Sequence, residues 1–272
     1  MRGSLPRSRA VWSGVVGLVM VATSCAPSSR EAEGVNGNRN RVVALLAAEQ
    51  PVFGIFSGDH TAEQGAAMAQ NRDTDFVFYS LESGPFDLPT MQSYMRALAE
   101  HAGEGGPPPF ALRIPPIRDG EEIARERVRE AMEAGVDAIV FPHVESAEQA
   151  TVAVEAMGTN LWPANPDGVH VNMLIVEDQV GVQHVREIAG TDGVSVVFAG
   201  PGDLRRAYDG DMDAVERAIQ TVLSACKEFN VPCGITAGVD DIADRLAQGF
   251  RAIIVTEPEA IGVGKQAAGR SD

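Results

Sequence analysis

Eight short apolar runs recur along the chain from residue 50 onward, and amphipathic segments separate them. Each run is almost continuously apolar, which is typical of a strand buried on both faces of a parallel sheet. The runs are Val52–Ser57, Asp75–Ser80, Phe110–Ile114, Ala138–Val144, Asn172–Val176, Val194–Ala199, Cys233–Thr236 and Ala252–Thr256. Parallel strands need long crossover connections, so this alternation restricts the chain to a few α/β folds.

The segments between the runs have the three- and four-residue apolar spacing of amphipathic helices. The expected helices are Leu88–His101, Glu121–Ala134, Ala147–Met157, Val180–Ile188, Asp213–Phe229 and Val239–Gln248. Glycines follow several of them, where a left-handed C-cap is favoured. The last segment, Glu257–Asp272, is short and rich in glycine, so we expect an eighth helix that is weak or packs on a neighbouring subunit.

This order of strands and helices predicts an α/β fold, a (β/α)8 TIM barrel over residues 50–272. Apolar residues make up 44% of the chain and charged residues 22%, which suits a packed core. A doubly wound open sheet is the alternative, but no GxGxxG motif follows the first strand.

The first 24 residues have the composition of a signal peptide. Arg2, Arg7 and Arg9 precede the apolar run Val11–Ala22, and small residues then lead to Cys25. The run is too short to span a bilayer easily, which takes roughly 20 residues. We therefore expect export to the periplasm or cell envelope. Small residues before a Cys also resemble a bacterial lipoprotein signal, with lipid on Cys25 tethering the protein to the membrane; plain secretion is the alternative.

The composition of the remaining chain bears on its partners. Residues 25–49 begin with a polar stretch rich in Gly, Ser and Asn, interpreted as a flexible tether. Cys226 and Cys233 are expected to be packed thiols rather than a disulfide. The net charge of −16 predicts repulsion from phosphate backbones and argues against nucleic acid as a partner.

Polar side chains follow the C-terminal ends of the runs, where TIM barrels hold their active sites. In chain order these are Ser57, Asp59, His60, Glu82, Ser83, Arg113, His143, Glu145, Glu177, Asp178, Gly200–Asp203, Thr236, Thr256 and Glu257. Carboxylates converging on one mouth repel each other unless a cation holds them. With no Cys and little His, this set suits a hard cation, Mg²⁺ or Mn²⁺, centred on Glu177 and Asp203.

Several of these residues allow two interpretations. Arg113 is placed to stabilise an oxyanion, but it also suits an ion pair with Glu82. The backbone N–H groups of Gly202 and Asp203 suit a substrate carboxylate, whereas Asp203 is also a common type of helix N-cap. His143 is as readily interpreted as a packed imidazole.

Taken together, these stretches resemble the HpcH/HpaI aldolase family and its citrate lyase beta-subunit relatives. The resemblance covers nearly all of residues 50–257. It rests on DFVFYSLESGPFD (75–87), ALRIP (111–115), GVDAIVFPHVESAEQA (135–150), LIVED (174–178) and VVFAGPGDL (196–204).

The resemblance implies a barrel of the phosphoenolpyruvate/pyruvate type that binds Mg²⁺ or another divalent cation, which pyruvate or a similar 2-oxo acid chelates. By motif position, Glu177 and Asp203 would be the metal ligands, and Arg113 would stabilise the enolate. Gly200, Gly202 and Asp203 would line the carboxylate pocket. The resemblance also implies a homo-oligomer.

The chain departs from the family pattern at catalytic positions. The family commonly has Asp-x-Glu-His where this chain has Ser80-Leu81-Glu82-Ser83, so Ser83 replaces the catalytic His and Ser80 its Asp partner. Ile175 replaces a Gln, and the shortened segment 158–171 lacks the family's Arg. His143 is on another strand of the same mouth and would supply a substitute base, since imidazole titrates near pH 6.5.

Three functions remain open on these grounds. The chain is a metal-dependent carbon–carbon lyase acting on a 2-oxo acid or related carboxylate, an exported non-catalytic binding protein for a small carboxylate, or a structural or interaction barrel. Retained cation binding separates the first two from the third. Turnover of a 2-oxo acid separates the first from the second.

Overall fold

Eight parallel strands close into a barrel in sequence order in the computed structural model, which describes residues 1, 3 and 40–270. Each strand pairs with its two chain neighbours, and β1 closes the ring on β8. The strands are β1 (Val52–Phe56), β2 (Phe76–Ser80), β3 (Phe110–Arg113), β4 (Ala138–Phe141), β5 (Val171–Val176), β6 (Val196–Ala199), β7 (Cys233–Ala237) and β8 (Ala252–Val255). The predicted (β/α)8 TIM barrel is confirmed. The predicted signal peptide, with Cys25, lies outside the described residues except at Met1 and Gly3.

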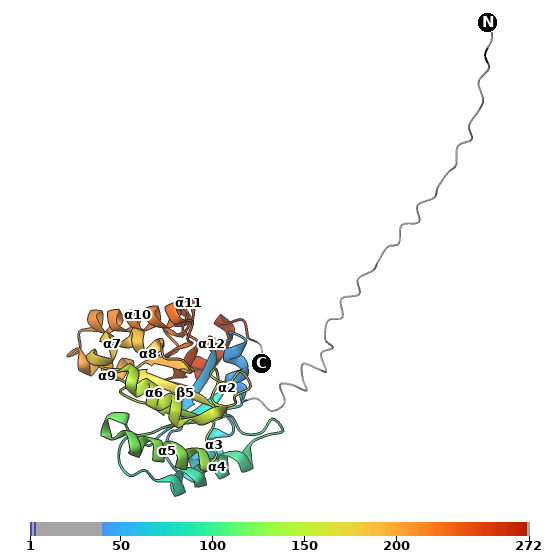
Figure 1. Cartoon of the computed structure of the whole chain (residues 1–272). Coiled ribbons are helices and arrows are strands. Elements are labelled where there is room, and N and C mark those ends of the chain that lie inside the picture. The colour runs from blue at the N-terminus through green and yellow to red at the C-terminus, as the bar shows by residue number, and fades with distance from the viewer. Residues whose placement is uncertain (2, 4–39, 271–272) are drawn as a thin grey trace. The chain divides into compact units, whose positions relative to one another are not determined.

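Helices follow the strands and surround the barrel (Figure 1). They are α2 (Arg41–Ala47), α3 (Ala62–Met68), α4 (Leu88–His101), α5 (Glu121–Glu133), α6 (Ala147–Ala156), α7 (Gln179–Gln183), α8 (Val185–Ala189), α9 (Pro201–Ala207), α10 (Met212–Phe229), α11 (Ile242–Gln248) and α12 (Glu259–Ala267). No helix in the described part of the chain is long and apolar enough to cross a membrane.

Several of these helices differ from the expectation. The single helix predicted over 180–188 is broken at His184 into α7 and α8. Helix α3 was not predicted, because its seven residues are too few to establish a helical period. The eighth helix is formed: α12 buries Ala260 and Ile261, so it packs on its own barrel. Cys226 and Cys233 are both buried and free, as expected.

The barrel interior is a layer of side chains separate from the layer between strands and helices. Two inward positions carry glycine next to a phenylalanine ring. A Cβ on Gly54 would lie 2.2 Å from the ring of Phe76, and one on Gly234 would lie 2.2 Å from that of Phe198. The glycines thus make room for two rings that fill the barrel, as the packing of a small closed barrel requires.

Helix α2 covers the N-terminal end of the barrel. Its Val42, Val43 and Leu46 are buried in the same cluster as the inward side chains of the strands. Residues 41–47 were predicted to belong to the tether, and this is wrong. The helix packs on the end of the barrel through only three apolar residues within five positions, which is too short a pattern to stand out in the sequence.

A buried carboxylate ties the ends of the domain together at this closed end. Asp75, which precedes β2, is fully buried and accepts the backbone N–H of Phe53 at 2.9 Å. The Arg41 Nε at the start of α2 donates to it at 2.8 Å, and both terminal nitrogens of Arg270 donate at 2.7 and 2.9 Å. One side chain therefore links β2, α2 and the segment after α12.

Replacing Asp75 by Asn is expected to lower the free energy of unfolding by about 3–5 kcal/mol, because the buried guanidinium of Arg270, whose side chain is only 5% exposed, would lose the charge of the carboxylate to which both its terminal nitrogens donate. Urea unfolding of the two proteins measures this difference. Glu133→Gln is the control: Glu133 is 66% exposed and its partner Arg129, 2.6 Å away, is 52% exposed, so its loss should cost less than about 1 kcal/mol. Equal effects of the two changes would contradict the role given to Asp75.

Candidate active site

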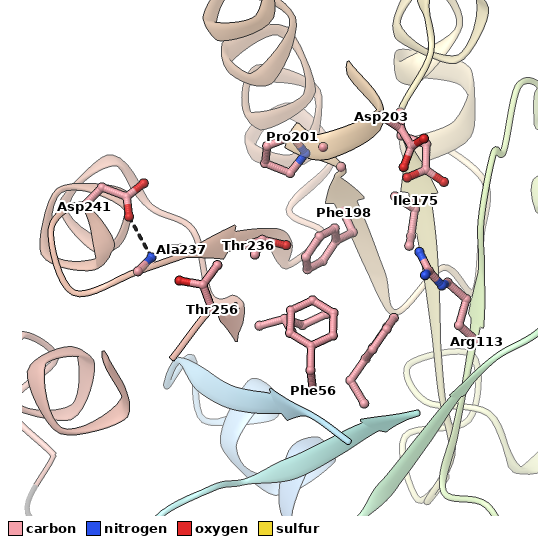
Figure 2. Close-up of a pocket in the computed structure, with 16 residues that line it drawn as sticks. Phe56, Arg113, Ile175, Phe198, Pro201, Asp203, Thr236, Ala237, Asp241 and Thr256 are labelled. Carbon is pink, nitrogen blue, oxygen red and sulfur yellow. Dashed lines mark hydrogen bonds between the residues drawn. The ribbon is translucent and has the colours of Figure 1, made fainter. Parts of the chain in front are cut away.

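A cavity of about 540 Å³ opens at the C-terminal ends of the strands. Figure 2 shows Arg113, Ile175 and Asp203 on one side of it, and Thr236, Thr256 and Asp241 on the other. The remaining lining residues include Phe56, Phe78, Glu177, Phe198, Gly200, Pro201, Gly202, Ala237, Gly238 and Ile254. The position agrees with the rule that TIM-barrel enzymes work at this mouth.

Three titratable side chains from different strands meet at the edge of this cavity. Glu82 follows β2, His143 follows β4 and Glu177 directly follows β5, and one ligand atom of each lies within 4.8 Å of the others. The His143 Nε2 is 3.7 Å from both Glu82 Oε1 and Glu177 Oε1. The parallel strands bring these residues together because their C-terminal ends share one edge.

Glu177 is the buried member of this cluster, with only 3% of its side chain exposed. The backbone N–H of His143 donates to its Oε1 at 3.0 Å. Burial raises the pKa of Glu177 to about 7, and the nearby negative charges of Asp203 and Glu82 act in the same direction. A carboxyl group with this pKa binds either a proton or a cation near neutral pH.

His143 lies between carboxylates on both sides. Its Nδ1 is 3.7 Å from Asp178 Oδ2, the distance of an ion pair rather than a hydrogen bond. Asp178, and then Glu177 and Glu82, raise the pKa of His143 above its usual value, while burial and Arg118 oppose them. The backbone of His143 has φ of 51°, unusual for a residue other than glycine and a form of strain that often occurs at active sites.

Arg113, the last residue of β3, is held in place by its neighbours. Its terminal nitrogen is 3.0 Å from Glu82 Oε2, and its Nε donates to Ser80 Oγ at 2.9 Å. The guanidinium also lies over the ring of Phe78, 5.3 Å from its centroid. The alternative interpretation of Arg113 as the partner of Glu82 is therefore confirmed, and the arginine also lines the cavity.

The loop after β6 is packed against Glu177. A Cβ on Gly200 would lie 2.6 Å from Glu177 Oε2, whereas one on Gly202 would meet nothing within 4 Å. Asp203, in the first turn of α9, lines the cavity and is close enough to raise the pKa of Glu177. Its carboxylate accepts a hydrogen bond from Arg206, one turn further along the helix.

Gly200→Ala is expected to displace the Glu177 carboxylate and weaken divalent-cation binding at least tenfold, because the added Cβ would lie 2.6 Å from Glu177 Oε2 and 3.0 Å from Ile175 Cγ2, which leaves no space for a methyl group. Gly202→Ala is the matched control two residues away and should bind the cation as the wild type does. Calorimetric titration with Mn²⁺ measures both affinities. An unchanged affinity in Gly200→Ala would contradict the close packing of the two residues.

The residues at the mouth fit a hard divalent cation. Glu82, Glu177 and Asp203 supply carboxylate oxygens, and His143 supplies a nitrogen. Two buried polar atoms of this region, His143 Nδ1 and Asp178 Oδ2, make no hydrogen bond. The predicted ligand pair Glu177 and Asp203 stays a prediction, since the ligand atoms that converge belong to Glu82, His143 and Glu177.

Some residues of the mouth were not found from the sequence. Arg118, whose guanidinium is 2.9 Å from Glu145 and 4.0 Å from Asp178, lies in the short 3-10 helix Ile117–Asp119, for which the sequence has no recognisable pattern. The rings of Phe78 and Phe198 also line the cavity. They occupy alternate, inward positions next to strand ends, a signal that was available from the period of two.

The protein is a TIM barrel with a candidate cation site at its C-terminal mouth. The site contains a cluster of carboxylates, a histidine and an arginine. The family model described as HpcH/HpaI aldolase/citrate lyase matches residues 60–256. The chain therefore belongs to the HpcH/HpaI aldolase/citrate lyase family.

Curated relatives carry aldolase names. The chain is 29% identical over 242 residues to a hydroxypyruvate/pyruvate aldolase of Delftia acidovorans, a match that covers 79% of this chain and 86% of that protein. It is also 29% identical over 260 residues to a 5-keto-4-deoxy-D-glucarate aldolase of Klebsiella pneumoniae, covering 84% and 93%. Both matches span nearly the whole barrel.

Solved structures share the fold. A family protein from Burkholderia cenocepacia superimposes with a TM-score of 0.68 at 23% identity, covering 85% of this chain and 98% of its own. The citrate lyase beta subunit of M. tuberculosis, solved with oxaloacetate and magnesium, gives a TM-score of 0.59 at 19% identity, covering 84% and 99%. At these identities the similarity concerns the fold.

Proposed function

We propose that this protein is a divalent-cation-dependent carbon–carbon lyase that acts on a 2-oxo acid through an enolate. The observation that carries the proposal is the convergence of Glu177, Glu82 and His143 beside Arg113 at the mouth of the barrel. Membership of an aldolase/citrate lyase family and relatives named as aldolases support it. The proposed cation is Mg²⁺ or Mn²⁺, held by Glu177 with Asp203.

Aldol cleavage of a 4-hydroxy-2-oxo acid breaks the bond between C3 and C4. The hydroxyl proton passes to a base, the electron pair moves towards the keto group, and the C4 fragment leaves as an aldehyde. A divalent cation, when bound, supplies Lewis-acid stabilisation of the charge that develops on the keto oxygen. Arg113 would donate N–H groups to the same oxygen, and His143 would take the hydroxyl proton.

The substrate carboxylate would lie against the turn Gly200–Asp203. The backbone N–H groups of Gly202 and Asp203 belong to the first turn of α9, where no carbonyl of the helix reaches them. Because residue 200 is glycine, this turn lies in contact with Glu177. The carboxylate of one small molecule would therefore lie at the turn while its keto group lies at the cluster of Glu82, His143 and Glu177.

Decarboxylation of oxaloacetate tests this proposal, because it needs enolate stabilisation but no base for a hydroxyl proton. We expect the purified chain to release pyruvate from oxaloacetate with Mg²⁺ or Mn²⁺, and to lose this activity in excess chelator. A lactate dehydrogenase assay follows the pyruvate against a blank of cation alone. Cation-dependent binding of 2-oxo acids without turnover would replace the lyase by the second candidate, a binding protein for a small carboxylate.

We further propose that the protein is exported, as the order of basic, apolar and small residues before Cys25 indicates. Mass spectrometry of the protein from its host would show a mature chain beginning at or near Cys25, with or without lipid. An intact chain starting at Met1 in the cytosolic fraction would contradict export. A homo-oligomer, as the family resemblance implies, stays a prediction.

A further inference from the structure

We infer that the substrate carries an uncharged apolar group on the carbon chain beyond its 2-oxo acid end, and that Phe56 selects for this group. The inference rests on the proposed function, which places the 2-oxo acid between Glu177 and Arg113. It concerns the part of the cavity that this end leaves open.

That part of the cavity has an apolar floor. Phe198 and Ile254 line it and are almost completely buried, so their side chains are fixed in the barrel. Phe56, at the end of β1, is 42% exposed and packs edge-on against Phe78, with the ring centroids 5.3 Å apart. Figure 2 shows Phe56 and Phe198 between the side with Arg113 and the side with Thr256.

Charge at the far side of the cavity disfavours a second carboxylate. Asp241 lines the cavity there, and Glu257 lies beside Gly238, since a Cβ on that glycine would be 2.8 Å from its Oε1. Among the lining residues in the described part of the chain, Arg113 is the only cation, and it already pairs with Glu82. An anionic group would therefore face carboxylates without a counter-charge.

The two carboxylates at the far side already have donors of their own. Asp241 accepts the backbone N–H of Gly238 at 2.8 Å (Figure 2). Glu257 accepts the N–H of Val239 at 2.5 Å and the hydroxyl of Thr256. A cationic group would lose its water to reach carboxylates that already accept hydrogen bonds, whereas an apolar group gains buried contact with the rings of Phe56 and Phe198, so the apolar group is favoured. Apolar walls with a few directed polar groups are typical of small-molecule sites.

Calorimetric titration of the Mg²⁺-loaded chain with three 2-oxo acids of similar size tests this inference without requiring turnover. The probes are 2-oxo-4-phenylbutanoate, 2-oxoglutarate and 2-oxo-5-guanidinopentanoate, which carry a phenyl, a carboxylate and a guanidinium group. We expect the phenyl compound to bind at least tenfold more tightly than the other two. Phe56→Ser should reduce this preference at least threefold.

Phe229→Ser is the matched control, because Phe229 is 41% exposed at the end of α10 and does not line this cavity. It should keep the wild-type preference. Tighter binding of the carboxylate or guanidinium compound, or an equal loss of preference in both variants, would overturn the inference while leaving the lyase proposal intact. Binding of pyruvate without binding of any of the three probes would also overturn the inference, whereas absence of binding by pyruvate as well would refute the proposed function.

Discussion

Glu177→Gln is expected to abolish divalent-cation binding and to lower oxaloacetate decarboxylation by about 10²–10³-fold, the scale on which single electrostatic groups act in an active site. Glu177 is the buried carboxylate of the cluster, and its side chain is the one on which both the His143 backbone and Gly200 pack. The amide has nearly the same shape, so the fold should be retained. Adding Asp203→Asn should remove any residual affinity.

Asp241→Asn is the control for Glu177→Gln, because it removes a carboxylate from the far side of the same cavity. It should leave the Mn²⁺ affinity within about threefold of the wild type, as expected for a charge away from the ligands. Calorimetry with Mn²⁺ and the pyruvate assay provide the two readouts. Equal Mn²⁺ affinity of wild type and Glu177→Gln would contradict the assignment of the cation site.

Cation binding should also depend on pH in a defined direction. Burial raises the pKa of Glu177 to about 7, so below this pH the carboxyl group is protonated and cannot bind a cation. The apparent affinity should therefore fall as pH decreases through 7, by up to about tenfold per unit, and should level off above it. An affinity that stays constant between pH 6 and pH 8 would contradict this.

His143→Ala is expected to reduce aldol cleavage by about 10²–10⁴-fold, the usual contribution of a general base, and to leave oxaloacetate decarboxylation comparatively unaffected. His143 is the imidazole at the mouth, with Nε2 3.7 Å from Glu82 and Glu177. Its pKa is raised by Asp178 first, so wild-type aldol cleavage should still be increasing with pH above about 6.5.

Two further variants support the test of His143. His101→Ala removes an exposed imidazole at the end of α4 and should change neither reaction. Ser83→His restores the residue that the family commonly has after Glu82. If it raises aldol turnover above that of the wild type, the missing histidine limits the rate. Equal loss of both reactions in His143→Ala would instead indicate that His143 acts on the cation site and not as the base.

The barrel was predictable because its signal is repeated. Every strand of a closed parallel barrel is covered on both faces, so each of the eight segments has a nearly continuous apolar run. The segments without repetition were the ones misjudged. Helix α2 was assigned to the tether. The predicted helix over 180–188 is broken at His184, whose backbone leaves the helical conformation between α7 and α8. His184 Nδ1 contacts the carbonyl of Glu145, far away in sequence.

The sequence predicted which polar residues lie at the C-terminal ends of the strands, but not the contacts between them. Glu82 and Glu177 follow their runs and His143 lies at the end of its own, and the topology then requires them to meet. The sequence left both interpretations of Arg113 open, because its ion pair with Glu82 depends on distances of a few ångströms that no residue pattern sets. Asp203 is similar: its hydrogen bond with Arg206 depends on α9 continuing for one turn.

The most direct test of the proposed cation site is an anomalous difference map from crystals of the protein soaked with Mn²⁺ and pyruvate. We expect a single strong peak at the mouth of the barrel, at the Glu177 carboxylate and on its Asp203 side, with pyruvate beside it facing Arg113. A map with no peak at Glu177 at millimolar Mn²⁺, or with pyruvate bound elsewhere, would contradict it.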